Sequence, residues 1–158
     1  MNELAQKAGR FLLKKRLSLS ICESCTGGML GSIITSISGS SKYFKGGIIA
    51  YSNPVKKRIA GVKNNTLRKF GAVSEQTARQ MAQGVRRITK SNIGISITGI
   101  AGPGGGTKKK PVGTVYIAIT DNKTILVFRF QFRGGREQIR KKACNKTLKL
   151  LINFIKGA

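Results

Sequence analysis

The chain has 158 residues, a length that suits one domain with a hydrophobic core of its own. Its 30 Lys and Arg outnumber 5 Asp and Glu, so the formal net charge is +25, and the sequence contains no histidine. The lack of histidine excludes Ser-His-Asp and Cys-His catalysis and every histidine-ligated metal site, and so few carboxylates leave little to hold a divalent cation.

The hydrophobic pattern predicts a single α/β domain over residues 1–158, with a mixed sheet and helices on both faces. Some segments repeat apolar residues at helical spacing, whereas others are short apolar runs typical of strands. The predicted elements are, in chain order, a helix over 3–16, a strand over 18–22, a helix over 27–37, a strand over 46–51, a helical turn from 52, a short helix between 64 and 71, a helix over 75–90 with Ser74 as its N-cap, strands over 93–98, 113–120 and 124–132, and a helix over 135–155.

The number of cysteines and the first residues of the chain indicate the cellular compartment of the protein. Three cysteines, an odd count, fit a reducing cytosol, and the start of the chain has charged residues at helical spacing where a signal peptide would be apolar. No apolar run approaches the roughly 20 residues that cross a membrane. We therefore expect a cytoplasmic protein with no membrane partner. Cys22-x-x-Cys25 at a strand-to-helix junction leaves redox chemistry as a rival, against which Cys22 is expected to point into the core.

The excess of basic residues has two readings. It is typical of proteins that bind nucleic acid or other anions. It is also what compositional drift produces, because Lys, Ile and Asn are abundant along the whole chain. The basic residues form no long arm, and no RNP, zinc-finger or KH pattern is present. We favour drift, and nucleic acid is not an expected partner.

Three segments that could carry chemistry each follow a predicted strand. They are residues 23–28, Tyr51-Ser52-Asn53 with Lys56, and residues 98–107, which are rich in glycine. Ligands of open α/β sheets gather at the carboxyl ends of strands, so we expect the three segments to converge. The glycine-rich loop could present N–H groups to a phosphate or an oxyanion, or be a flexible surface loop. Residues 24–28 could bind an anion at a helix N-terminus, or only cap that helix.

A hydrolase without histidine needs another base. Lysine or tyrosine can take this role when desolvation or neighbouring cations lower the pKa. Lys56 follows Tyr51 by five residues, and Ser40 and Ser41 precede the same predicted strand. A serine with a lysine or tyrosine base is therefore chemically feasible, although one lysine among so many is ordinarily a solvated surface charge.

Six ordered motifs carry a family resemblance over about residues 5–155. They are Glu23-Ser24-Cys25-Thr26-Gly27-Gly28, Gly39-Ser40-Ser41 with Phe44 and Gly47, Tyr51-Ser52-Asn53 with Lys56, Gly71-Ala72-Val73-Ser74-Glu75, Thr98 through Gly105, and Lys110-Pro111-Val112-Gly113-Thr114-Val115. The chain resembles the C-terminal domain of the CinA (competence/damage-inducible) family, whose stand-alone members are the PncC-type nicotinamide-nucleotide amidases. The resemblance implies a three-layer α/β/α domain with a mixed five-stranded sheet, no metal or organic cofactor, and a small nucleotide as partner; a homo-oligomer is compatible with it.

The implied reaction is hydrolysis of nicotinamide mononucleotide to nicotinic acid mononucleotide and ammonia. Carried over to this sequence, the resemblance suggests Ser41 as nucleophile with Lys56 and Tyr51 as base, and Ser24 and Ser40 as competing nucleophiles. Residues expected to bind substrate or line an oxyanion hole are Ser24, Thr26, Gly27, Gly28, Thr98, Gly99, Gly102 and Gly105, with Arg136 as phosphate clamp and Arg140 one turn later.

One position departs from the family pattern. Many relatives carry an acid where this chain has Gly104, and the loop that follows is unusually cationic. The alternative function is therefore a catalytically weak or inactive domain of the same family that binds nucleotides or nucleic acid.

Overall fold

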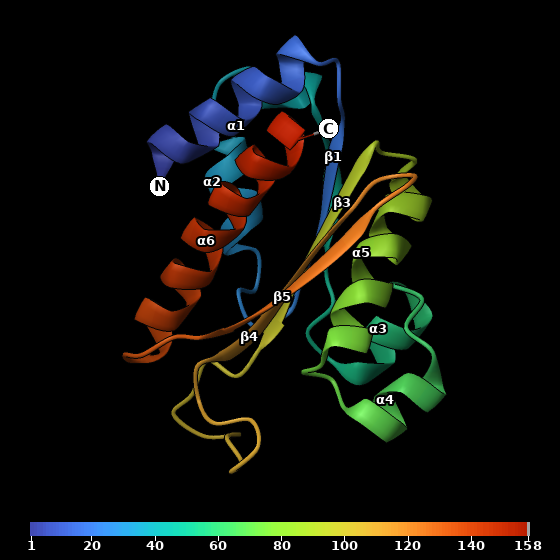
Figure 1. The fold of residues 1–158 in the computed structure, drawn as a ribbon, viewed down its shortest axis with the longest axis vertical. Coiled ribbons are helices and arrows are strands. Elements are labelled where there is room, and N and C mark those ends of the chain that lie inside the picture. The colour runs from blue at the N-terminus through green and yellow to red at the C-terminus, as the bar shows by residue number, and fades with distance from the viewer. Residues whose placement is uncertain (158) are drawn as a thin grey trace.

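The fold is a mixed five-stranded sheet with helices on both faces, described over residues 1–157 by a computed structural model (Figure 1). The elements are α1 (Asn2–Lys14), β1 (Leu19–Glu23), α2 (Met29–Thr35), the 3-10 helix η1 (Ser40–Lys42), β2 (Phe44–Ile49), α3 (Asn53–Arg58), α4 (Asn64–Phe70), α5 (Glu75–Thr89), β3 (Ile93–Gly99), β4 (Thr114–Thr120), β5 (Ile125–Gln131) and α6 (Arg136–Gly157).

The strand order is β2-β1-β3-β4-β5. The first three strands of this order run parallel to one another, and β4 and β5 continue the sheet as an antiparallel hairpin. Helices α1, α2 and α6 cover one face, and α3, α4 and α5 lie on the other (Figure 1). The predicted mixed α/β sheet with both faces covered is confirmed. Because β1, β2 and β3 are parallel and adjacent, their carboxyl ends meet at one edge of the sheet.

The hydrophobic core has a larger part on one face of the sheet and a smaller part on the other. The larger part lies between the sheet and α1, α2 and α6, and includes Leu12, Leu30 and Leu148. The smaller part lies under α3 and α5, where Met81 packs near Cys22 of β1. Helix α5 lies directly on the strands, since a Cβ at Gly94 would overlap the carbonyl oxygen of Ala82. This close contact fixes α5 against the central strands.

Most predicted boundaries differ from the structure by one or two residues, and two of these differences lie next to the site. Helix α2 begins at Met29 rather than 27, because Gly27 and Gly28 have φ angles of +56° and +93°, which an α-helix does not accommodate. Strand β2 covers 44–49 rather than 46–51, since its ladder with β1 already begins at Phe44. Tyr51 therefore lies beyond the strand, on the connection to α3. The predicted N-cap of α5 is confirmed: the Ser74 hydroxyl accepts a hydrogen bond from the Thr77 N–H.

Among residues 1–157, no helix combines the length and the apolar composition needed to cross a bilayer.

Candidate active site

A serine and a lysine lie in contact at the carboxyl ends of the parallel strands. The Lys56 Nζ is 2.9 Å from the Ser24 Oγ. Ser24 is the first residue after β1, and Lys56 lies in α3, which follows β2. Since β1 and β2 are adjacent and parallel, two residues 32 positions apart in sequence meet at the same edge. Both side chains are buried, with exposed fractions of 8% for Ser24 and 1% for Lys56.

Burial makes the ammonium form of Lys56 less favourable than it is in water. Nζ donates hydrogen bonds to the carbonyl oxygens of Ala50 at 2.7 Å and Tyr51 at 3.3 Å. In the described chain the ion pairs are Arg79–Glu75 and Lys141–Glu137, so no carboxylate compensates the Lys56 charge. Burial lowers the pKa of Lys56 below its ordinary value of 10.5. In the structure Nζ also donates to the Ser24 Oγ. After loss of one proton, the amine can keep its two hydrogens on the two carbonyls and accept the Ser24 hydroxyl proton with its lone pair, which is the arrangement a general base requires.

The residues at the start of helix α3 explain why Lys56 lies at this position. The Ser52 hydroxyl caps the helix by accepting the Val55 N–H, and Pro54 stands in the first turn, where its missing N–H leaves no bond unmade. Lys56 then lies on the face of α3 that packs against the sheet, beside a core of small residues that includes Ala50 and Ala60. Its neighbours Lys57 and Arg58 are exposed, as expected for ordinary surface cations.

A buried carboxylate holds the turn that carries Ser24. Glu23, which is 1% exposed, accepts hydrogen bonds from the N–H groups of Gly28, Leu30 and Gly31 at the start of α2. The anion site expected at this helix N-terminus is therefore filled by the protein's own side chain. The N–H groups of Gly27 and Gly28, predicted to bind substrate, already have partners: the Gly28 N–H donates to Glu23, and the Gly27 N–H donates to the Ser24 carbonyl.

A cavity of about 240 Å³ opens in front of the Ser24–Lys56 pair. The three segments expected to converge do so here, and a fourth wall comes from the residues before α5. The lining residues are Ser24, Cys25, Tyr51, Asn53, Lys56, Ala72, Val73, Thr98, Gly99, Ala101 and Arg136. Thr98 is fully buried and its hydroxyl donates to the Ala72 carbonyl at 2.7 Å, so it holds two walls together. Sequence reasoning missed this contribution of Ala72 and Val73, although their motif had been singled out.

Arg136 closes one side of the cavity. It is the first residue of α6 and is exposed. One guanidinium nitrogen donates to the Tyr51 hydroxyl and the other to the Gly102 carbonyl, each at 2.8 Å. The guanidinium thus links the segment after β2 with the loop after β3. It is a fixed cation at the mouth of the cavity, where a phosphate group could replace one of the two protein acceptors.

The structure does not bring Ser41, the predicted nucleophile, together with Lys56. Ser41 is exposed and lies in η1, before β2, whereas Lys56 follows β2. The strand between them places the two residues at opposite edges of the sheet, roughly 20 Å apart at about 3.3 Å per residue. Ser40 lies in the same short helix. Ser24, named only as a competing nucleophile, is the serine that contacts the lysine.

Three other predicted binding residues, Thr26, Gly102 and Gly105, do not line the cavity, although the Gly102 carbonyl accepts a hydrogen bond from Arg136. Thr26 is fully buried, and its carbonyl accepts a hydrogen bond from Arg140 at 2.7 Å, which ties the turn after β1 to α6. Gly105 is exposed in the loop between β3 and β4, with a φ of +85°. Gly104, the position of the departure from the family pattern, is exposed in the same loop.

The cysteines lack the features of a redox centre. Cys22 packs in the core under α5, and Cys25 packs in the core on the opposite face of the sheet. Burial raises the pKa of each thiol to about 12, so neither is a thiolate at neutral pH. The rival redox interpretation of the CxxC spacing is not supported.

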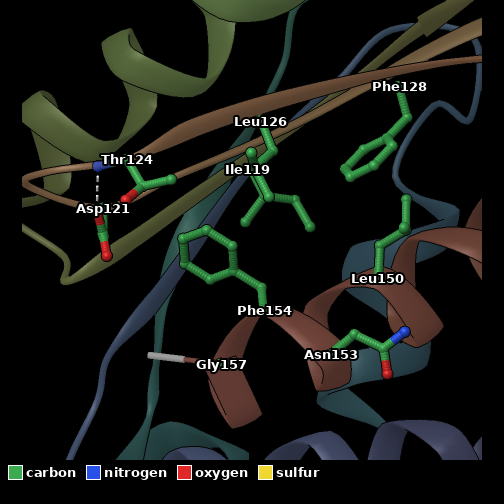
Figure 2. Close-up of a pocket in the computed structure, with 9 residues that line it drawn as sticks. All are labelled: Ile119, Asp121, Thr124, Leu126, Phe128, Leu150, Asn153, Phe154 and Gly157. Atoms are coloured by element: carbon green, nitrogen blue, oxygen red, sulfur yellow. Dashed lines mark hydrogen bonds between the residues drawn. The ribbon is translucent and has the colours of Figure 1, made fainter.

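A larger cavity of about 390 Å³ lies elsewhere, between the hairpin and the end of α6 (Figure 2). Its walls are mostly apolar, with Leu126 and Phe128 from β5 facing Leu150 and Phe154 from α6. Among the described residues that line it, Asp121 is the one with an ionisable side chain, and its carboxylate accepts the Thr124 N–H. The Asp121 carboxylate accepts the backbone N–H groups of Lys123 and Thr124 in the hairpin turn, and the other walls are mostly apolar, so the size of this cavity does not make it the catalytic site.

Known proteins that are similar to this chain include members of one protein family. Residues 1–155 match the model of the CinA C-terminal domain family. A CinA-like protein of Endomicrobium trichonymphae is 51% identical over 148 residues, which cover 94% of this chain and 35% of that protein. A putative competence-damage inducible protein of Desulforudis audaxviator is 45% identical over 155 residues, 98% of this chain and 38% of that protein. The chain thus spans little more than a third of these relatives.

Solved structures agree with this assignment. The competence/damage inducible protein CihA of Agrobacterium tumefaciens superposes with a TM-score of 0.94 at 39% identity, over 96% of this chain and 93% of that one. A competence-damaged protein (CinA) superfamily member of Klebsiella pneumoniae gives a TM-score of 0.96 at 29% identity, over 99% and 98% of the two chains.

Proposed function

Because the chain belongs to the CinA C-terminal domain family, we propose that it is an amidase of this family, which hydrolyses nicotinamide mononucleotide to nicotinic acid mononucleotide and ammonia. The observation that carries the proposal is the buried contact between Ser24 and Lys56. A serine activated by a desolvated lysine is one of few ways to open a carboxamide without histidine. The motif resemblance to the stand-alone amidases supports the choice of substrate.

The first half of the reaction acylates Ser24. The Lys56 amine takes the hydroxyl proton as the Ser24 Oγ bonds to the carboxamide carbon. The tetrahedral intermediate then collapses with cleavage of its carbon–nitrogen bond, and the Lys56 ammonium gives its proton to the departing nitrogen, which leaves as ammonia. In the second half, water attacks the acyl carbon and gives a proton to Lys56. The Ser24 Oγ leaves and recovers that proton, so the enzyme returns to its starting state.

Arg136 is the proposed ligand of the substrate phosphate. Its guanidinium lies at the mouth of the cavity and offers two donors, a geometry suited to a phosphate. Tyr51, which already accepts one of these hydrogen bonds, is half exposed beside it and would lie along the nucleotide. Tyr51 is a positioning residue in this account, whereas the structure gives Lys56 the contact that a base needs. Thr98 and Gly99 would face the pyridine ring from the β3 side of the cavity.

The test is ammonia release from nicotinamide mononucleotide by the purified chain. We expect turnover by the parent protein, and we expect Ser24→Ala to lose at least about 1000-fold in kcat because no other hydroxyl within residues 1–157 is hydrogen-bonded to the Lys56 Nζ. Ser41→Ala is the matched control, since it removes the same hydroxyl at the other edge of the sheet, and it should keep parental turnover. A folded parent protein that releases no ammonia would overturn the proposal.

A further inference from the structure

A second polar cavity lies at the opposite edge of the sheet from the Ser24–Lys56 pair. Its volume is about 390 Å³, larger than that of the candidate active site, and it lies in the range of small-molecule pockets. It is formed where α1 ends and where β1, β2 and β3 begin. The lining residues are Leu12, Leu13, Arg16, Leu17, Ser18, Lys42, Lys45 and Asn92.

Three cations from three separate segments line this cavity. Arg16 comes from the turn after α1, Lys42 from η1 and Lys45 from β2. No carboxylate is among the lining residues, and within residues 1–157 none of the three side chains makes a hydrogen bond or ion pair. Three like charges around one concave surface repel one another, and an anion bound between them would relieve that repulsion.

Two hydrogen-bonded residues that line the cavity, Ser18 and Asn92, leave a donor free. The Asn92 Oδ1 accepts hydrogen bonds from both the N–H and the hydroxyl of Ser18, each at 2.8 Å, and the Ser18 hydroxyl accepts the Asn92 N–H. These bonds fix which end of the Asn92 amide is oxygen. The amide NH₂ group therefore keeps its hydrogens for another acceptor, and a phosphate oxygen is one that the surrounding charge would favour.

Arg16 occupies a backbone position that ordinarily belongs to glycine. Its φ is +52°, and it ends α1 with the bonds of a Schellman motif: the Arg16 N–H donates to the Leu13 carbonyl, and the Leu17 N–H donates to the Leu12 carbonyl. A side chain in this left-handed conformation is strained relative to glycine. Residues held in such conformations cluster at binding sites, where the side chain has a use that offsets the strain.

We propose that this cavity, with Arg16, Lys42 and Lys45 around it and Asn92 in its lining, binds a phosphoryl or pyrophosphoryl group of a nucleotide-sized small molecule. The site is separate from the proposed amidase site, because the two lie at opposite ends of the parallel strands. The proposal is independent of the amidase reaction and stands or falls on its own binding data.

The test compares two glycine substitutions that are alike in everything except the cavity. Lys90 also follows a helix, α5, has a φ of +53° and does not line the cavity. Arg16→Gly and Lys90→Gly each remove one positive charge and one strained side chain. We expect both variants to gain about 2–4 °C in Tm as the strain is relieved. Lys42→Ala removes a second lining cation from an exposed position and should leave Tm unchanged.

Binding of inorganic pyrophosphate is measured by titration calorimetry at physiological salt. We expect the parent protein to bind, Arg16→Gly and Lys42→Ala to weaken binding about 10- to 100-fold, and Lys90→Gly to bind like the parent. Equal weakening by Lys90→Gly would show diffuse attraction to the net charge and overturn the proposal, as would absence of binding by the parent. A single-stranded oligonucleotide forms the second arm: oligonucleotide binding that depends on Arg16 without pyrophosphate binding would assign the cavity to a nucleic acid and refute a small-molecule site. Nicotinamide mononucleotide turnover should be the same in all three variants and the parent.

Discussion

Replacing Glu23 with glutamine tests the claim that its buried carboxylate holds the turn between β1 and α2, which carries Ser24. The carboxylate accepts the N–H groups of Gly28 and Leu30 at 3.1 Å and of Gly31 at 2.8 Å. Glutamine retains one oxygen and replaces the other by an NH₂ group, which cannot accept. At least one of the three bonds is therefore lost, and the rest lose their charge assistance.

The magnitude follows from these contacts. A buried hydrogen bond to a charged group contributes about 1.5–3 kcal/mol, and a carboxylate near a helix N-terminus contributes roughly 0.3–1 kcal/mol more. We expect Glu23→Gln to lower the free energy of unfolding by about 2–4 kcal/mol, equivalent to roughly 5–15 °C in Tm for a chain of this size. Because Ser24 is the next residue, turnover should fall as well.

The assay is urea unfolding followed by circular dichroism at neutral pH. Glu3→Gln is the control, since Glu3 is an exposed acid in the first turn of α1 and makes no buried hydrogen bond, so its loss should change stability by less than about 0.5 kcal/mol. If Glu23→Gln were as stable as Glu3→Gln, the carboxylate would not hold the turn and the explanation for the position of Ser24 would be wrong.

Four further predictions concern the charges and thiols of the candidate site. The amidase kcat/KM should rise with pH through the lowered pKa of Lys56, because only the neutral amine is a base, and an acid limb absent from the profile would contradict this. The stability of the protein should also rise with pH, because the unfolded chain binds the Lys56 proton more tightly than the native chain. The free energy of unfolding of the parent, measured relative to Lys56→Met, should therefore increase between the lowered pKa of Lys56 in the folded protein and about pH 10.5. In the folded protein, Cys22 and Cys25 should resist a thiol reagent at pH 8, because burial raises the pKa of both thiols to about 12. They should react only after denaturation. Fast reaction of the folded protein would restore the redox interpretation. Arg136→Ala should lower kcat/KM for nicotinamide mononucleotide about 10- to 100-fold, mainly through KM, and a pure kcat effect would remove its role as phosphate ligand.

Much of the fold follows from the sequence because its patterns are local. The apolar run before Thr98 and the hairpin around Asp121 predict β3, β4 and β5 to within one or two residues. The hydroxyl of Ser74 marks the start of α5 in the sequence as it does in the structure. The convergence of the three polar segments could also be predicted, because the carboxyl ends of parallel strands lie at the same edge of the sheet.

The same reasoning applies to which serine can contact Lys56. Ser41 precedes β2 and Lys56 follows it, so a strand must separate the two residues. Ser24 and Lys56 each follow a strand and satisfy the rule. What the sequence could not supply was the order of β1 and β2 in the sheet, which puts this particular pair in contact.

The role of Glu23 was beyond prediction from sequence for a different reason. A glycine-rich turn before a helix predicts an anion at the helix N-terminus, and the pattern is the same whether the anion is a ligand or a side chain. The carboxylate that fills the site lies at the end of β1, where alternation alone does not show which way it turns. Only the three hydrogen bonds from α2 identify it as an internal cap.

The most direct test of the central claim is detection of the covalent intermediate on Ser24. Mass spectrometry of the protein quenched during turnover of nicotinamide mononucleotide should show a nicotinoyl-nucleotide adduct on the peptide that contains Ser24, and Lys56→Ala should abolish it. An adduct on a peptide that contains Ser41, or turnover by a Ser24→Ala variant at the parental rate, would contradict the assignment of the Ser24–Lys56 pair.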